Sequence, residues 1–159
     1  MQNEYLKPLV GNITLHEQGL WESTTALKFN PGCTVPGFGA DPVLPNTAHV
    51  ADSGMLSHVH GQSLGDSIAF TSPVTTIDEA TGQTATFIKL EIEGSELKAL
   101  HGARQTIARN RPQMAISMYH KPEDLLTLTE FVVETDKGYR LGFRQHNRLC
   151  PDAMVMYCA

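Results

Sequence analysis

Two glutamates stand two positions apart in the stretch FIKLEIEGSELKALHGA, residues 87–103. On an extended strand Glu91 and Glu93 share one face, and they directly precede Gly94, where the chain can turn. Burying a carboxylate costs free energy unless the group is paired or hydrogen-bonded. The two acids therefore either belong to a structural network or line a site that opens at the end of the strand.

A second polar pair, Tyr119 and His120, follows the apolar run at 114–118. The ordinary pKa of a histidine lies near neutrality, which makes His120 the best candidate for a general base. The alternative is that His120 forms a hydrogen bond at the start of a helix and takes no part in chemistry. Tyr119 is interpreted as a packing residue with a polar tip.

A strand–helix–strand unit would position these side chains. Residues 86–91 and 114–118 have the apolar runs of strands, and a helical stripe of apolar residues extends over 95–110. Such a unit makes a right-handed crossover between parallel strands. Ligands of open α/β sheets bind beyond the carboxyl ends of such strands, so the acids and the Tyr-His pair are predicted to meet at one pocket.

The C-terminal part continues the same pattern. A second helix is predicted from Pro122, with Gly138 placed to cap its C-terminus, and two strands follow at 139–144 and 153–157. The order over 86–159 is therefore βαβαββ, which predicts an α/β sheet that ends in an antiparallel hairpin.

The first 85 residues are richer in strands and loops. A strand over 13–21 is predicted to pair with one over 25–29, and short strands are predicted at 66–71 and 74–77. The intervening loop, 30–65, contains Pro31, Pro36, Pro42 and Pro45. The whole chain, 1–159, is interpreted as a single domain.

His58 and His60 are the residues that suggest a metal. Two residues at i and i+2 share a face of a strand, as zinc ligands can. The segment reads as loop, however, and no third ligand is evident nearby, so no metal site is predicted.

Composition excludes several classes of protein. The formal net charge of −5 argues against a general binder of nucleic acid or of anionic membranes. No apolar run is long enough to span a bilayer, and the first ten residues lack the pattern of a secretory signal. Cys33, Cys150 and Cys158 are odd in number and lack metal-type spacing, which predicts reduced thiols in a cytoplasmic protein.

The stretch 87–103 resembles the FkbM-type family of S-adenosylmethionine-dependent methyltransferases, whose pattern is roughly F-I-K-x-D-x-E-G-x-E-x-x-x-L-x-G-A. The segments Arg111-Pro112, YHKPEDL at 119–125 and GYRL at 138–141 are also similar to the family. The resemblance implies a class I, Rossmann-like sheet, S-adenosylmethionine as cofactor, and methyl transfer to a hydroxyl oxygen of a small molecule or sugar.

The resemblance also implies roles for individual residues. Glu91 replaces the family's Asp, which keeps the charge on an arm one methylene longer, and Glu91 and His120 are the implied catalytic residues on the acceptor side. Gly19, Leu20 and Glu93 are the implied cofactor contacts. Glu96, in contrast, is expected mainly to stabilise the start of a helix.

One part of the family fold has no counterpart in the sequence. A class I methyltransferase begins with a strand, a glycine-rich turn and a helix, but the G-x-G at 37–39 lies in the proline-rich loop. We therefore expect a sheet truncated at the N-terminus, with open strand edges that a second copy or a partner chain could complete. The alternative function is a non-catalytic methyltransferase-like domain that binds such a partner.

Overall fold

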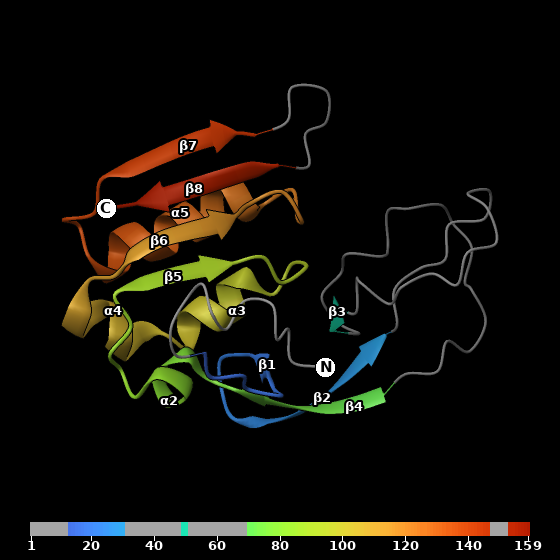
Figure 1. Ribbon diagram of the computed structural model, residues 1–159. Coiled ribbons are helices and arrows are strands. Elements are labelled where there is room, and N and C mark those ends of the chain that lie inside the picture. Colours follow the sequence, from blue (N-terminus) through green and yellow to red (C-terminus); the bar gives the residue numbers. More distant parts are fainter. Residues whose placement is uncertain (1–12, 31–48, 51–69, 147–152) are drawn as a thin grey trace, which may run out of the picture.

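The computed structural model describes residues 13–30, 49–50, 70–146 and 153–159 (Figure 1). Its described part contains two four-stranded sheets, ordered β1-β4-β2-β3 and β5-β6-β8-β7. The first sheet comprises β1 (Gly19–Leu20), β2 (Thr25–Asn30), β3 (His49–Val50) and β4 (Phe70–Thr75). The second comprises β5 (Phe87–Leu90), β6 (Gln113–Ser117), β7 (Leu141–Gln145) and β8 (Met154–Cys158). The helices are α2 (Ile77–Thr81), α3 (Glu96–His101), α4 (Arg104–Asn110) and α5 (Asp124–Thr135).

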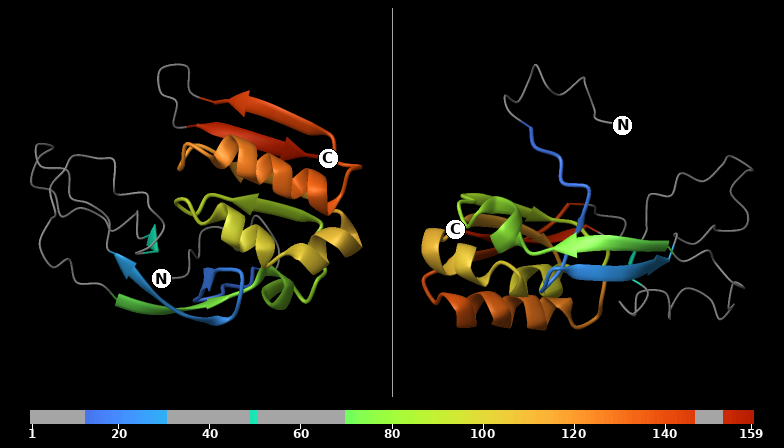
Figure 2. Two further views of the ribbon diagram at one scale, coloured as in Figure 1. Left: turned by 180° about the vertical axis from the view of Figure 1, so that it is seen from behind. Right: turned by 90° about the horizontal axis from the view of Figure 1, so that it is seen from below.

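The second sheet carries the predicted crossover and hairpin. Strands β5 and β6 are parallel and are connected through α3 and α4, while β8 runs antiparallel to both β6 and β7. Helices α3, α4 and α5 all lie on one face of this sheet (Figure 2). Phe87, on the opposite face, is 58% exposed. The α/β class and the C-terminal antiparallel hairpin are confirmed, and among the described residues the helices cover only one face of β5.

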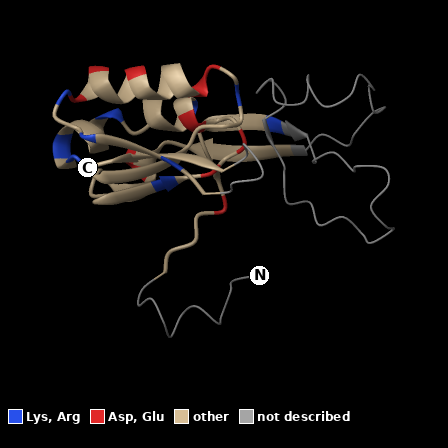
Figure 3. Cartoon of the chain, turned by 90° about the horizontal axis from the view of Figure 1, so that it is seen from above, with Lys and Arg blue, Asp and Glu red and all other residues tan. Residues whose placement is uncertain are grey.

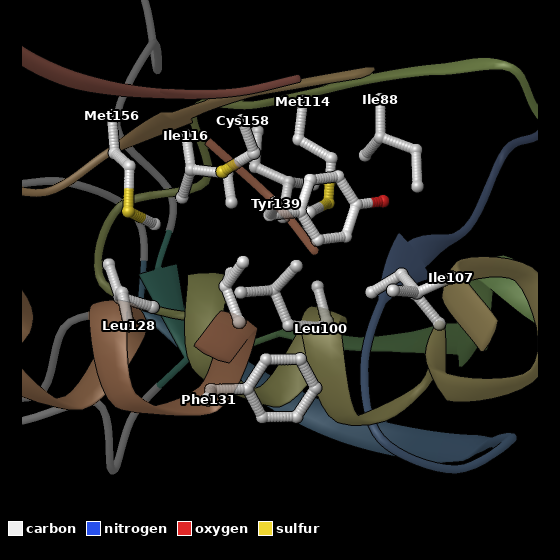
Figure 4. Packing of buried hydrophobic residues seen from close by; sticks show 14 of the residues in the cluster. Ile88, Leu100, Ile107, Met114, Ile116, Leu128, Phe131, Tyr139, Met156 and Cys158 are labelled. Carbon is white, nitrogen blue, oxygen red and sulfur yellow. The ribbon is translucent and has the colours of Figure 1, made fainter. Parts of the chain in front are cut away.

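The core lies between this sheet and its helices (Figure 4). Ile88 and Ile116 point from the sheet toward Leu100 and Leu128 on the helices, and all four side chains are buried. Complete burial of such a side chain contributes about 1.5–3 kcal/mol to folding. This packing fixes the ends of β5 and β6 relative to α3 and α5, and those ends carry the polar residues.

Tyr139 closes the core beside β6. Its hydroxyl donates a buried hydrogen bond of 2.8 Å to the carbonyl oxygen of Pro112. Burial raises the pKa of Tyr139 to about 12, because the phenolate would lose its hydration there. Burial likewise raises the pKa of Cys158 to about 12, and this thiol forms no disulfide. Cys33 and Cys150 lie outside the described residues.

The first sheet differs from its prediction in pairing. Residues 13–18 are not a strand, and β2 pairs with β4 and β3 instead of with the 13–21 segment. Short β1 instead runs parallel to β4, with Gly19 opposite Val74. The short connection between the predicted strands at 13–21 and 25–29 favoured a hairpin between them. In the structure β2 pairs instead with β4, which is far from it in sequence.

The end of β4 also differs from expectation. Ile77, predicted to end a strand, is the first residue of α2, because the side chain of Thr76 caps that helix. The hydroxyl oxygen of Thr76 accepts a hydrogen bond of 3.0 Å from the backbone N–H of Glu79.

The predicted helix over 95–110 is two helices, because contacts from outside it interrupt it at Gly102. A Cβ at position 102 would overlap the backbone carbonyl oxygen of Trp21. The carbonyl oxygen of Gly102 accepts from the backbone N–H of Asp78 at 2.9 Å. The carboxylate of Asp78 in turn accepts from the backbone N–H groups of Gln105 and Thr106, at 3.1 and 2.7 Å. Helix α4 therefore begins anew with a cap supplied by another element.

The predicted cap at Gly138 is wrong by two residues. Helix α5 ends before Asp136, which is extended, and the backbone N–H of Gly138 donates a 2.7 Å hydrogen bond to the carboxylate of Asp136. The short side chain of Asp136, as hydrogen-bond acceptor, thus orders the turn that Gly138 was expected to make in a left-handed conformation.

The basic residues of the described ranges are not confined to one element. Lys and Arg are distributed over helices and strands alike (Figure 3). Within these ranges no helix is both long and apolar enough to cross a membrane. His58, His60 and the G-x-G at 37–39 lie outside the described residues.

Gly102→Ala tests the close approach of the α3–α4 connection to the backbone of Trp21. We expect the substitution to lower the free energy of unfolding by about 1–3 kcal/mol, because the methyl group meets backbone that cannot rotate away. Urea unfolding followed by circular dichroism measures the loss. Gly142→Ala is the matched control, since nothing lies within 4 Å of its added Cβ. Equal effects of the two substitutions would contradict the close approach.

Candidate functional site

Polar side chains gather at the carboxyl ends of β5 and β6. Leu90 of β5 pairs with Ile116 of β6, so the residues that follow each strand emerge at the same edge of the sheet. Glu91 and Glu93 follow β5, and His120 follows β6. Glu96 and Asp124 are the first residues of α3 and α5, which begin at this edge.

Glu91 is the acid that solvent can reach. Its side chain is 37% exposed, although Leu90 directly before it is buried. The Tyr119 hydroxyl donates to its carboxylate at 2.6 Å, and the Ser117 hydroxyl donates to the other carboxylate oxygen. Glu91 is therefore held in one orientation by two hydroxyl groups from the neighbouring strand and its extension, and the carboxylate remains accessible.

The ring of His120 lies behind Glu91 and is buried, with 1% of its side chain exposed. Its Nε2 lies 3.3 Å from an oxygen of Glu91 and 3.6 Å from an oxygen of Glu93. Its Nδ1 lies 3.0 Å from Oε1 of Glu96, whose side chain is also 1% exposed. His120 thus connects the accessible acids to the buried one.

The charges around His120 determine its protonation. Burial alone lowers the pKa of His120, but the carboxylates of Glu96, Glu93 and Glu91 outweigh burial and raise it. For Glu96, burial raises the pKa, yet the contact with His120 and a backbone hydrogen bond from Ile92 reverse the sign and lower it. The pair is therefore favoured as imidazolium and carboxylate near neutral pH.

Asp124 is the second buried acid of this cluster, beside Glu96 and His120. Its carboxylate accepts a 2.8 Å hydrogen bond from the backbone N–H of Lys121, which orders the segment between β6 and α5. Burial raises the pKa of Asp124, and the negative charge of Glu96 adds to the rise. Two buried carboxyl groups therefore share the neighbourhood of one imidazole.

The turn after β5 has unusual backbone conformations. Glu93 has φ 55° and Gly94 has φ 86°, both in the left-handed region. A residue other than glycine seldom adopts this region, and such strain is concentrated at functional sites. These two residues turn the chain directly from β5 into α3, so Glu93, 25% exposed at its side chain, stays beside His120.

The structure brings three of the five predicted site residues together. Glu91, Glu93 and His120 form one cluster, whereas Gly19 and Leu20 belong to β1 of the first sheet. Leu20 is partly buried and packs against the hydrophobic core. None of these contacts tests the catalytic or cofactor-binding roles, which stay predictions.

Sequence reasoning missed two members of the cluster. The role of Asp124 had a local signal, because an acid three residues after Lys121 is a pattern for a hydrogen bond to the preceding backbone. Ser117 is the last residue of an apolar strand and gave no signal, because its contact with Glu91 depends on the pairing of two strands.

Glu96→Gln tests the source of the raised His120 pKa. The substitution keeps the shape and the oxygen that accepts from Ile92, but it removes the negative charge beside the ring. We expect the pKa of His120 to fall, because burial then opposes the imidazolium with less compensation. A pH titration by NMR in metal-free buffer measures it. Glu130→Gln, on an exposed part of α5, should leave the pKa unchanged. A His120 pKa that is the same in both variants would contradict this account.

Comparison with known proteins identifies the family. Residues 39–141 match the family model described as methyltransferase FkbM domain. The crystal structure of methyltransferase FkbM from Methylobacillus flagellatus KT is similar, with a TM-score of 0.65 and 27% sequence identity. That match covers 98% of this chain and 31% of the other, so the chain spans about a third of that protein's length. No match was found among curated proteins. On the family match, which extends over more than half of the chain and includes the Glu91–His120 cluster, the protein belongs to the methyltransferase FkbM domain family.

Proposed function

We propose that the protein takes part in S-adenosylmethionine-dependent methyl transfer to a hydroxyl oxygen of a small molecule or sugar. The observation that carries the proposal is the accessible carboxylate of Glu91, held by two hydroxyl groups at the carboxyl ends of β5 and β6. This is the edge at which open α/β sheets bind their ligands. Membership of a methyltransferase family supports the reaction class.

In this proposal Glu91 is the general base. S-adenosylmethionine supplies an electrophilic methyl group on a sulfonium ion. Glu91 would accept the proton that the acceptor hydroxyl loses when its oxygen receives that methyl group. His120 has a buried ring 3.3 Å from that carboxylate, so it orients Glu91 and balances its charge. This assignment keeps both residues on the acceptor side.

The residues present suit part of the cofactor. S-adenosylmethionine carries positive charges on its sulfonium and amino groups, and the partly exposed carboxylate of Glu93 is a suitable partner for them. By the family resemblance, Gly19 and Leu20 border the adenine. In the described ranges, no strand is followed by a glycine-rich turn that opens a helix. We therefore propose that a class I sheet is completed by strands that the described ranges do not contain.

Calorimetric titration tests cofactor binding directly. We expect saturable binding of S-adenosylmethionine and of its demethylated product to the folded chain, and weaker binding to Glu93→Ala, which lacks the proposed charge partner. Circular dichroism on the same samples verifies folding. Glu134→Ala, on the exposed side of α5, is the control that should bind normally. A folded chain that binds neither compound would contradict the proposal for this chain alone.

Glu91→Gln tests the proposed base. With a methyl-labelled donor and a panel of small hydroxyl-bearing and sugar acceptors, we expect transfer to fall by about 10²–10⁴-fold, because the amide cannot accept the proton. Cofactor binding by calorimetry should remain within a factor of about two. Equal transfer rates in the variant and the original chain would eliminate Glu91 as the base.

A second candidate function is partner binding by a non-catalytic methyltransferase-like domain. Strand β5 is an edge strand of its sheet in the described part of the chain, and Phe87 on it is 58% exposed. Figure 1 shows the β1 edge of the first sheet turned toward this β5 edge. Unpaired edges favour pairing with another chain, so the partner is either a second copy or another polypeptide that supplies strands.

Phe87→Ser tests whether the chain associates with a second copy through the β5 edge. If the β5 edge binds a second copy, sedimentation of the original chain should show concentration-dependent association that Phe87→Ser weakens at least tenfold. Phe143→Ser, on β7 with a similar exposure of 49%, should leave association unchanged. Association that both variants retain would exclude the β5 edge as the contact.

We further propose a cytoplasmic location, a small-molecule acceptor, and no nucleic-acid or membrane partner. The net charge of −5 and the scattered lysines and arginines support the absence of a polyanion partner (Figure 3). The buried Cys158 without a disulfide accords with a reducing compartment.

A further inference from the structure

Three metal-ligating side chains converge behind the accessible acid. One carboxylate oxygen of Glu96, one ring nitrogen of His120 and one carboxylate oxygen of Asp124 lie within 4.8 Å of one another. Glu96 and Asp124 are the first residues of two different helices, and His120 lies between β6 and α5. Side chains separated by up to 28 positions in the sequence are thus directed to one point by the fold.

The cluster contains buried polar atoms that lack a hydrogen-bond partner. These are Oε2 of Glu96 and Nδ1 of His120, in side chains that are each 1% exposed. Nδ1 is 3.0 Å from Oε1 of Glu96, which is close enough for an ion pair. The two groups are not aligned for a hydrogen bond. Leaving such a group unsatisfied costs about 1–3 kcal/mol, or more when it is charged. A bound cation would satisfy both atoms at once.

The charge of the cluster also calls for a cation. Glu96 and Asp124 place two carboxyl groups beside one imidazole, and Glu91 and Glu93 approach the ring from its Nε2 side. The nearby Lys121 contacts Asp124 through its backbone N–H. We propose that Glu96, His120 and Asp124 bind a divalent transition-metal ion at the carboxyl ends of β5 and β6.

The surroundings of His120 are those of a metal-bound histidine. Histidine ligands usually give their second ring N–H to a carboxylate, which fixes the tautomer and the ring orientation. With the ion on Nδ1, the Nε2–H is left for the oxygen of Glu91 at 3.3 Å and that of Glu93 at 3.6 Å. The ion would therefore hold Glu91 in place from behind without occupying the accessible side of its carboxylate.

The ligand types select the kind of ion. One imidazole nitrogen with two carboxylate oxygens suits Zn²⁺, Co²⁺ or Mn²⁺, whereas Ca²⁺ and Mg²⁺ prefer sites made of oxygen alone. Three protein ligands leave at least one position for water. The site does not depend on the proposed methyl transfer, since a chain that binds no cofactor can still bind the ion.

Metal titration of the complete chain tests the proposal. The purified protein is stripped with chelator and titrated with Zn²⁺ by calorimetry and with Co²⁺ by visible absorption. We expect one equivalent to bind and the Co²⁺ bands to show nitrogen and oxygen ligands. Glu96→Gln and Asp124→Asn should each weaken binding at least tenfold. Glu134→Gln and the double variant H58A/H60A should bind as the original chain does, which separates this site from the two histidines in the proline-rich loop.

A second readout covers variants that fail to fold. In the ¹⁵N spectrum of the original chain, Zn²⁺ should shift the Nδ1 resonance of His120 far more than Nε2. Absence of stoichiometric binding by the folded chain would overturn the proposal. So would binding that H58A/H60A abolishes, or Zn²⁺ binding that leaves both His120 nitrogens unshifted.

Discussion

The ring of His120 is the group on which the arrangement of this site depends. Glu91, Glu93, Glu96 and Asp124 all lie at one edge of the sheet, and their negative charges repel one another. A buried imidazole contacts carboxylates on both of its sides, which reduces the repulsion between the acids at the ends of β5 and β6. Without that ring, Glu96 would be a buried acid held by backbone N–H groups alone among its described partners.

Local patterns predicted the order of strands and helices in the second half of the fold. The apolar runs around Ile88 and Ile116 and the helical stripe through Leu100 place both strands and the first crossover helix, because each signal lies within a few residues. The interruption at Gly102 could not be predicted, since its causes, Trp21 and Asp78, are distant in sequence. The pairing of β2 with β4 was missed for the same reason.

The site was predictable in location and less so in geometry. The rule that ligands bind beyond the carboxyl ends of parallel strands brought Glu91, Glu93 and His120 together. The direction of the His120 ring, inward with 1% of its side chain exposed, depends on Glu96 and Asp124 and on helix positions that a sequence does not specify. The cluster therefore has an exposed acid, Glu91, that can contact a ligand. The buried side chains of His120 and Glu96 lie behind Glu91 and hold it in place.

The cap that Asp78 gives to α4 has a consequence for the order of folding. Helix α4 has seven residues and no side-chain cap at its own start, and the N–H groups of Gln105 and Thr106 are satisfied by an acid 27 and 28 positions earlier. So short a helix is marginal in isolation. We therefore expect α4 to become ordered only after α2 has docked against it, a non-local contact that forms more slowly than a local one.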